Sequence, residues 1–208
     1  MTENIESLIS SKAKDLYTDS QAISIGQILN IYKDDELKLF PNFQRYFRWD
    51  DYQKSRLVES VLINIPIPTI FFSQDQQANL EVVDGLQRIC TLLQFMGELK
   101  GISPFKLSGL KVLAELNGKA WKDFPDSLKK DFKRKSLNTV TILRIGGSEA
   151  KYDLFDRINS GGSPTTSQEV RNAFIDREAP ALNVLIDSLA SNSDFQEACS
   201  LPESQLIQ

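Results

Sequence analysis

Apolar residues along the chain change repeatedly between the two-residue period of a β-strand and the three-to-four-residue period of a helix. The strand period, together with β-branched residues, predicts strands at 37–40, 69–72, 80–83 and 138–145. The helical period predicts helices over residues 22–32, 50–62, 86–99, 125–132, 149–158, 166–174 and 181–189. Strands are concentrated in residues 37–145 and helices dominate after residue 148, which predicts an α+β fold.

Two segments fit this pattern less regularly. Residues 103–121 carry large apolar side chains at uneven spacing, and we interpret them as short strands in a hairpin. Residues 1–20 are polar with scattered charge and predict an N-terminal arm. The chain is therefore expected to consist of this arm, an α+β domain over residues 21–147 and a helical extension over residues 148–208 that packs on it. We also expect the natural protein to continue beyond Gln208.

The 208-residue sequence contains no histidine. This absence excludes Ser–His–Asp and Cys–His catalysis and zinc sites that use histidine. Any chemistry must therefore use carboxylates, arginine, lysine, amides or a hard metal ion. The formal net charge of −4 provides no overall attraction to nucleic acid, so any contact with DNA must be local.

The two cysteines and the N-terminal sequence indicate the cellular compartment of the protein. Cys90 and Cys199 lie far apart and lack metal-ligand spacing, which favours a reducing compartment. No run of apolar residues approaches the roughly 18 that a membrane span requires. Glu3 and Glu6 stand where a signal peptide would be basic and then apolar. We therefore expect a cytoplasmic protein with no membrane contact.

Residues 80–93 predict a buried strand, a tight turn and an amphipathic helix in direct succession. Asp84, Gly85, Gln87 and Arg88 gather where the strand ends and the helix begins. One interpretation is structural, with a turn, a helix start and Arg88 in a surface ion pair. The other is an anion site, in which the helix N-terminus and Arg88 bind phosphate and Gly85 allows close approach to the backbone. Asp84 could then hold a ribose hydroxyl or a metal ion.

The segment 42–49 interleaves Gln44, Arg45 and a second arginine with four aromatic residues. It fits a hydrophobic loop that anchors the next helix, with the arginine side chains reaching water. It fits equally a recognition loop, in which arginine binds phosphate and an aromatic ring stacks on a base. Both interpretations remain open at this point.

The predicted helix beginning at Pro125 carries a run of basic residues with Asp131 among them. A charge run of this kind usually forms a solvated face. If the protein binds DNA, the same side chains are candidates for phosphate contacts. These candidate DNA-binding residues are Lys129, Lys130, Lys133, Arg134 and Lys135.

Three motifs follow one another along the chain: the Gln44-Arg45 loop that ends at Trp49, the turn 84–88, and a Phe155-to-Asn159 segment. Together they resemble the N-terminal domain family of the GmrSD-type, modification-dependent restriction endonucleases, over roughly residues 23–190. That family shows a Gln-Arg-x-Tyr-x-Trp loop, an Asp-Gly-Gln-Gln-Arg turn and a Phe-x-x-Ile-Asn segment in this order. Here Phe47 replaces the usual tyrosine, and Leu86 replaces the first glutamine of the turn.

The resemblance implies a ParB/sulfiredoxin-like fold, with a small mixed sheet and flanking helices, and nucleoside triphosphate binding within residues 21–147. Members of the family often hydrolyse the nucleotide, and Mg²⁺ is the cofactor expected with it. Asp84, Gln87 and Arg88 would then be catalytic, and Asp84 would be the metal ligand. Leu86 predicts binding with poor hydrolysis, and the absence of a cysteine within the turn excludes sulfiredoxin chemistry. The nucleotide-binding residues carried over by position are Gln44, Arg45, Asp84, Gly85, Arg88 and Asn159.

We therefore predict a nucleoside-triphosphate-binding and hydrolysing domain of a bacterial DNA-restriction or phage-defence protein. The alternative is a non-catalytic, ParB-like DNA-recognition or regulatory module. DNA cleavage would require a separate nuclease domain, because a His-Asn-His motif is impossible without histidine. The expected partners are DNA, including modified phage DNA, a downstream or separate nuclease domain, and further copies of the chain.

Overall fold

The computed structural model describes most of the first 145 residues and short pieces of the remainder. The described ranges are residues 5–7, 9–10, 16–39, 47–145, 154, 157–158, 182, 185 and 188–189. The chain divides into two compact units, Met1–Ile158 and Asn159–Gln208. Every described strand belongs to the first unit, and the four described residues of the second unit are helical. The three-part division expected from the sequence stays a prediction.

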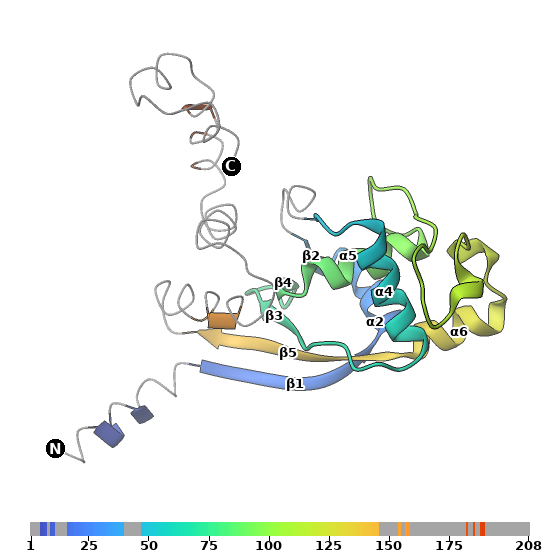
Figure 1. Ribbon diagram of the computed structural model, residues 1–208. Helices are drawn as coiled ribbons and strands as arrows, with labels where there is room; N and C mark the ends of the chain where they lie inside the picture. Colours follow the sequence, from blue (N-terminus) through green and yellow to red (C-terminus); the bar gives the residue numbers. More distant parts are fainter. Residues whose placement is uncertain are drawn as a thin grey trace, which may run out of the picture. The chain divides into compact units, whose positions relative to one another are not determined.

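A five-stranded mixed sheet forms the centre of the first unit, with the strand order β1-β5-β3-β4-β2 (Figure 1). The pairs β1–β5 and β3–β4 are antiparallel, whereas β3–β5 and β2–β4 are parallel. This arrangement confirms the predicted α+β class, with a small mixed sheet and flanking helices. The strands are β1 (Leu16–Ser24), β2 (Leu37–Lys38), β3 (Ile70–Gln74), β4 (Leu80–Asp84) and β5 (Ser136–Ile145).

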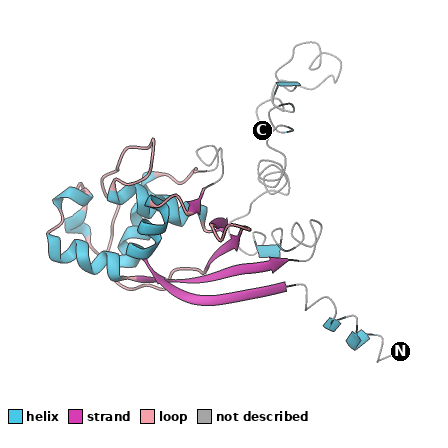
Figure 2. Cartoon of the chain, turned by 180° about the vertical axis from the view of Figure 1, so that it is seen from behind, coloured by secondary structure: helices cyan, strands magenta, loops and turns pink. Residues whose placement is uncertain are grey.

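Helices flank the sheet and gather at one end of the long β1–β5 pair, whose other end extends past them (Figure 2). They are α2 (Ile25–Lys33), α4 (Asp51–Leu62), α5 (Leu86–Met96) and α6 (Asp126–Arg134). Local sequence explains where two of them begin. Ser24 and Asp50 each form a reciprocal capping box with a glutamine three residues later, at the starts of α2 and α4.

The main core lies between one face of the sheet and the helices. Strand register places Phe72 opposite Val82, and strand alternation puts Ile70 on the same face. Every residue of α5 from Ile89 to Met96 is buried, so this helix is enclosed on all sides rather than amphipathic. The start of α5, and the turn that precedes it, is therefore fixed in place by the core.

An aromatic cluster surrounds the far end of α5. The ring centroid of Phe95 lies 5.5 Å from that of Phe105, 5.7 Å from Trp121, 5.5 Å from Phe124 and 6.0 Å from Phe132. Tilted and edge-on contacts at these distances are the favourable geometries for aromatic pairs. The cluster ties α5 to α6 and to the connection between them.

The hairpin of short strands predicted for residues 103–121 is wrong. The segment contains two 3₁₀ turns, Ala114–Leu116 and Trp121–Asp123, and no strand. Its ends meet through only two backbone hydrogen bonds, from Leu107 N to Lys119 O (2.9 Å) and from Gly118 N to Leu107 O (2.7 Å). Its buried apolar residues, Phe105, Leu107 and Leu110, belong to the main core, so the uneven spacing reflects packing into the core rather than a strand.

β1 begins at Leu16, within the residues expected to form the arm, and pairs with β5 along its whole length. β1 is an edge strand with exposed side chains, and Tyr17 remains 64% exposed. Such a strand needs little apolar character, so its sequence resembled an arm. The helices predicted after residue 148 lie almost entirely outside the described residues.

Candidate functional site

The turn between β4 and α5 brings Asp84, Gly85 and Arg88 together. Asp84 ends β4, and Gly85 is the N-cap of α5 in the left-handed region, with φ of 97°. A Cβ atom on Gly85 would lie 3.0 Å from Ile70 Cγ1 and 3.2 Å from Ile70 Cγ2. Both the dihedral angle and the contact with Ile70 therefore require glycine. The packing of β3 explains this glycine without invoking a ligand.

Arg88 holds the turn against the segment that leads into β3. Its Nη2 donates to Asp84 Oδ2 at 2.5 Å, and its Nη1 donates to the carbonyl oxygens of Pro68 (2.8 Å) and Thr69 (3.4 Å). The Arg88 side chain is only 11% exposed, so the ion pair is partly buried rather than on the surface. A guanidinium carries five N–H donors, so these three acceptors, the partners of Arg88 within the described residues, leave donors for a further anion.

Gln87 connects the turn to the end of the aromatic and arginine-containing loop. The backbone N–H of Trp49 donates to Gln87 Oε1 at 3.3 Å. Two of the three sequence motifs are therefore in direct contact, although 38 residues separate these two positions. Gln44, Arg45 and Asn159, which were predicted to complete the site, lie outside the described residues.

The comparisons with known proteins agree with this arrangement of motifs. Residues 25–175, well over half of the chain, match the family of GmrSD restriction endonuclease N-terminal domains. The chain belongs to this family. No curated protein and no solved structure gives a match.

Leu86 is the position at which this GmrSD-type domain departs from the family's turn. Its side chain is partly buried and packs against the main core. Leu86 therefore helps to anchor α5 in the core, as its position in the helical pattern of apolar residues predicted. A glutamine at this position would have to turn its polar end away from the same contacts.

A metal site at this turn would depend on the bound nucleotide. Within residues 16–39 and 47–145, no group of three or more Asp, Glu or Cys side chains is arranged to hold a metal ion. Mg²⁺ in nucleotide sites is commonly held by one or two carboxylates together with phosphate oxygens and water. Asp84 would fit this role only if phosphate oxygens completed the site, because one of its carboxylate oxygens already accepts from Arg88.

The structure supports the exclusion of sulfiredoxin-like chemistry. Cys90 is fully buried within α5, and burial raises the pKa of its thiol to about 12. A thiolate is the nucleophilic form of cysteine, and it is not populated near neutral pH at such a pKa. Cys90 therefore acts as a small core residue.

Two basic residues of α6, Lys130 and Arg134, lie on the solvent side of that helix, opposite the fully buried Phe132. Lys130 and Arg134 are exposed, whereas Lys129 and Lys133 are partly buried. Two acids lie near them, since Lys129 Nζ is 4.0 Å from Asp126 and Arg134 Nη1 is 3.8 Å from Asp131. At the end of the run, Lys135 Nζ donates to Asn64 Oδ1 at 2.5 Å.

Sequence reasoning missed the acceptors that orient Arg88 and the role of Trp49. Pro68 and Thr69 contribute backbone carbonyl oxygens, and Trp49 contributes a backbone N–H. Backbone groups are present at every residue, so no side-chain pattern identifies them.

None of the helices in the described part of the chain has the length and apolar character that a membrane span requires.

Proposed function

We propose that this GmrSD-type domain binds a nucleoside triphosphate, with its phosphates at the turn between β4 and α5. The observation that carries the proposal is the fixed guanidinium of Arg88 beside a helix start that no side chain caps. A helix N-terminus and an arginine with further guanidinium N–H donors are both favourable partners for phosphate. The contact of Gln87 with Trp49 supports a shared site with the Gln44-Arg45 loop.

Hydrolysis would rely on positioning and charge neutralisation, which dominate phosphoryl transfer. Asp84 would hold Mg²⁺ or polarise the attacking water, and Gln87 would supply a neutral hydrogen bond. Arg88 would neutralise charge on the phosphates, with Gln44, Arg45 and Asn159 as further ligands. Leu86 offers no hydrogen bond where the family has glutamine, so we propose slow turnover in this chain. We further propose a role in the restriction of modified phage DNA, with cleavage by a separate nuclease domain.

Calorimetry with each nucleoside triphosphate and Mg²⁺, combined with measurement of phosphate release, tests this function. Arg88→Met is expected to weaken nucleotide affinity by about ten- to a hundredfold, because charge-assisted hydrogen bonds are lost. Arg56→Met, at an exposed arginine of α4, is the matched control and should leave affinity unchanged. Leu86→Gln should raise the rate of phosphate release. Neither binding nor release by the wild-type chain would reject the proposal.

The basic residues of α6 support a second candidate function, DNA binding. Lys129, Lys130 and Lys133 would then neutralise backbone phosphates. Replacing all three with glutamine is expected to reduce the slope of log affinity against log salt by about two to three, at roughly 0.9 per phosphate contact.

Gel-shift titrations across a salt series measure this slope. The control replaces the same number of exposed lysines in the 103–121 segment, Lys106, Lys111 and Lys119, with glutamine. An equal change of slope in the control would show that only net charge matters. Affinity that does not depend on salt would contradict DNA binding by α6.

A further inference from the structure

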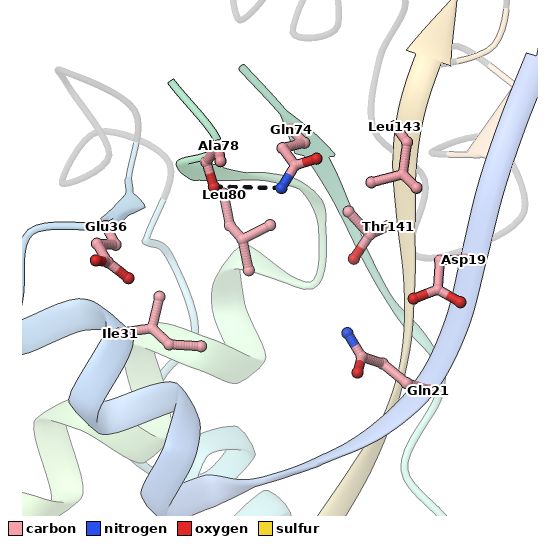
Figure 3. A pocket seen from close by; sticks show the side chains of 9 residues that line it. All are labelled: Asp19, Gln21, Ile31, Glu36, Gln74, Ala78, Leu80, Thr141 and Leu143. Atoms are coloured by element: carbon pink, nitrogen blue, oxygen red, sulfur yellow. Dashed lines mark hydrogen bonds between the residues drawn. The ribbon is translucent and has the colours of Figure 1, made fainter. Parts of the chain in front are cut away.

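A hollow separate from the Asp84 turn lies over the sheet, beside α2. It has a volume of about 270 Å³ and is lined by residues of β1, β3, β4, β5, α2 and the connections after α2 and β3 (Figure 3). Leu80 borders the hollow at the start of β4, whereas Asp84 ends the same strand. The two sites are therefore about 13 Å apart along β4, at about 3.3 Å per residue.

Thr141 of β5 lines the hollow with a polar atom that lacks a hydrogen-bond partner among the described residues. Thr141 is only 3% exposed, and within the described part of the chain its Oγ1 has no hydrogen-bond partner. Buried hydroxyl groups without a partner are rare because they cost folding free energy. Figure 3 shows this hydroxyl directed toward the space between Gln21 and Leu80. A ligand in the hollow would provide the missing partner.

Two carboxylates face the hollow from opposite sides. Asp19 lies on β1, directly opposite Thr141 in the strand register. Glu36 precedes β2 and is fixed by its carbonyl oxygen, which accepts from Leu80 N at 2.8 Å. Because β1 and β2 are the two outer strands, about four inter-strand spacings, or roughly 19 Å, separate their axes. Both side chains line the hollow between these two strands (Figure 3).

The remaining lining is aliphatic or offers further oxygen acceptors. Ile31, Leu80 and Leu143 provide an apolar surface between the two carboxylates. Gln74 uses its Nε2 to donate to Ala78 O at 3.3 Å, which leaves its carbonyl oxygen as an acceptor. None of the described residues that line the hollow is lysine or arginine. The hollow is therefore rich in acceptors and unsuited to a phosphate.

We propose that this hollow binds a linear aliphatic polyamine. Its terminal ammonium groups would donate to Asp19 and Glu36, and an inner ammonium would donate to Thr141 Oγ1. The methylene groups between them would lie on Leu80 and Leu143, whose aliphatic surface matches them. Charge, spacing and apolar surface together favour this class over a metal ion, which would need converging ligands.

Calorimetry of the 208-residue chain with spermidine at constant ionic strength tests the proposal. Asp19→Asn, Glu36→Gln and Thr141→Val are each expected to weaken spermidine binding at least tenfold. Glu115→Gln removes the same charge at an exposed position of the 103–121 segment and should leave binding unchanged. The shorter diamine putrescine should bind more weakly than spermidine, because it cannot reach both carboxylates.

Thermal unfolding of the same samples separates binding from folding. Thr141→Val should keep or raise the melting temperature, since it removes a buried hydroxyl without a partner. Equal spermidine affinity in Asp19→Asn, Glu115→Gln and wild type would overturn the proposal. Mg²⁺ binding as tight as that of spermidine would also overturn it, because attraction to the negative net charge would then suffice. Asp19 is exposed, so its variant tests the site even if Thr141→Val does not fold.

Discussion

Replacing Phe95 with alanine is expected to lower the free energy of unfolding by about 3–5 kcal/mol. Phe95 is fully buried, and its ring contacts four other aromatic rings at centroid distances of 5.5–6.0 Å. Truncation would remove the transfer free energy of the ring and leave a cavity that the rigid neighbouring rings cannot fill. Urea unfolding followed by circular dichroism measures the change.

Two further variants serve as references for the loss of stability in Phe95→Ala. Phe95→Leu keeps most of the volume and should cost about 1–2 kcal/mol. Val112→Ala, at a residue that is 65% exposed, should change stability by less than about 0.5 kcal/mol. A loss below about 1 kcal/mol for Phe95→Ala would show that the aromatic cluster does not hold α5, α6 and their connection together.

Replacing Glu59 with alanine is expected to cost about 2–4 kcal/mol, because it leaves two backbone N–H groups without their acceptor. Glu59 of α4 is only 7% exposed, and its Oε1 accepts from Val112 N at 2.9 Å and from Leu113 N at 2.8 Å. Ser55, one turn earlier, accepts from Ser108 N at 2.9 Å. These side chains of α4 substitute for a partner strand along the 103–121 segment.

Equilibrium unfolding and limited proteolysis of the 103–121 segment measure the effect of the Glu59 change. Glu59→Gln keeps a carbonyl acceptor in place and should lose less stability than Glu59→Ala. Glu115→Ala, at an exposed glutamate, should stay within about 0.5 kcal/mol of wild type. Unchanged proteolysis in Glu59→Ala would contradict the role of this carboxylate.

Regular elements with local signals could be predicted from the sequence. β5 has β-branched residues in alternation, and Ser24 and Asp50 cap the N-termini of α2 and α4. The 103–121 segment could not be predicted, because its backbone is satisfied by Glu59 and Ser55, about 50 residues earlier. The strand character of β1 was missed for a related reason, since its stability comes from pairing with a distant strand.

The candidate site could likewise be predicted only where local sequence determines it. The sequence pointed to Asp84, Gly85 and Arg88, and the structure places them together at one turn. Arg88 is oriented by the carbonyl oxygens of residues 68 and 69, about 20 positions earlier in the chain. These backbone groups leave no signal in the sequence. The hollow beside Thr141 was also invisible in the sequence, because its residues come from separate elements that only the completed sheet brings together.

The position of β5 has a consequence for biosynthesis. β5 lies between β1 and β3 and pairs with both, yet more than one hundred residues separate Ser24 from its partner Ser136. At about 5–20 residues per second, β1 therefore emerges from the ribosome at least about 5 s before any partner exists for it. During that interval, the polar side chains of β1 favour solvation of the unpaired segment over burial against other apolar surfaces. The polar residues that made β1 resemble an arm therefore limit the apolar surface that the unpaired strand exposes during synthesis.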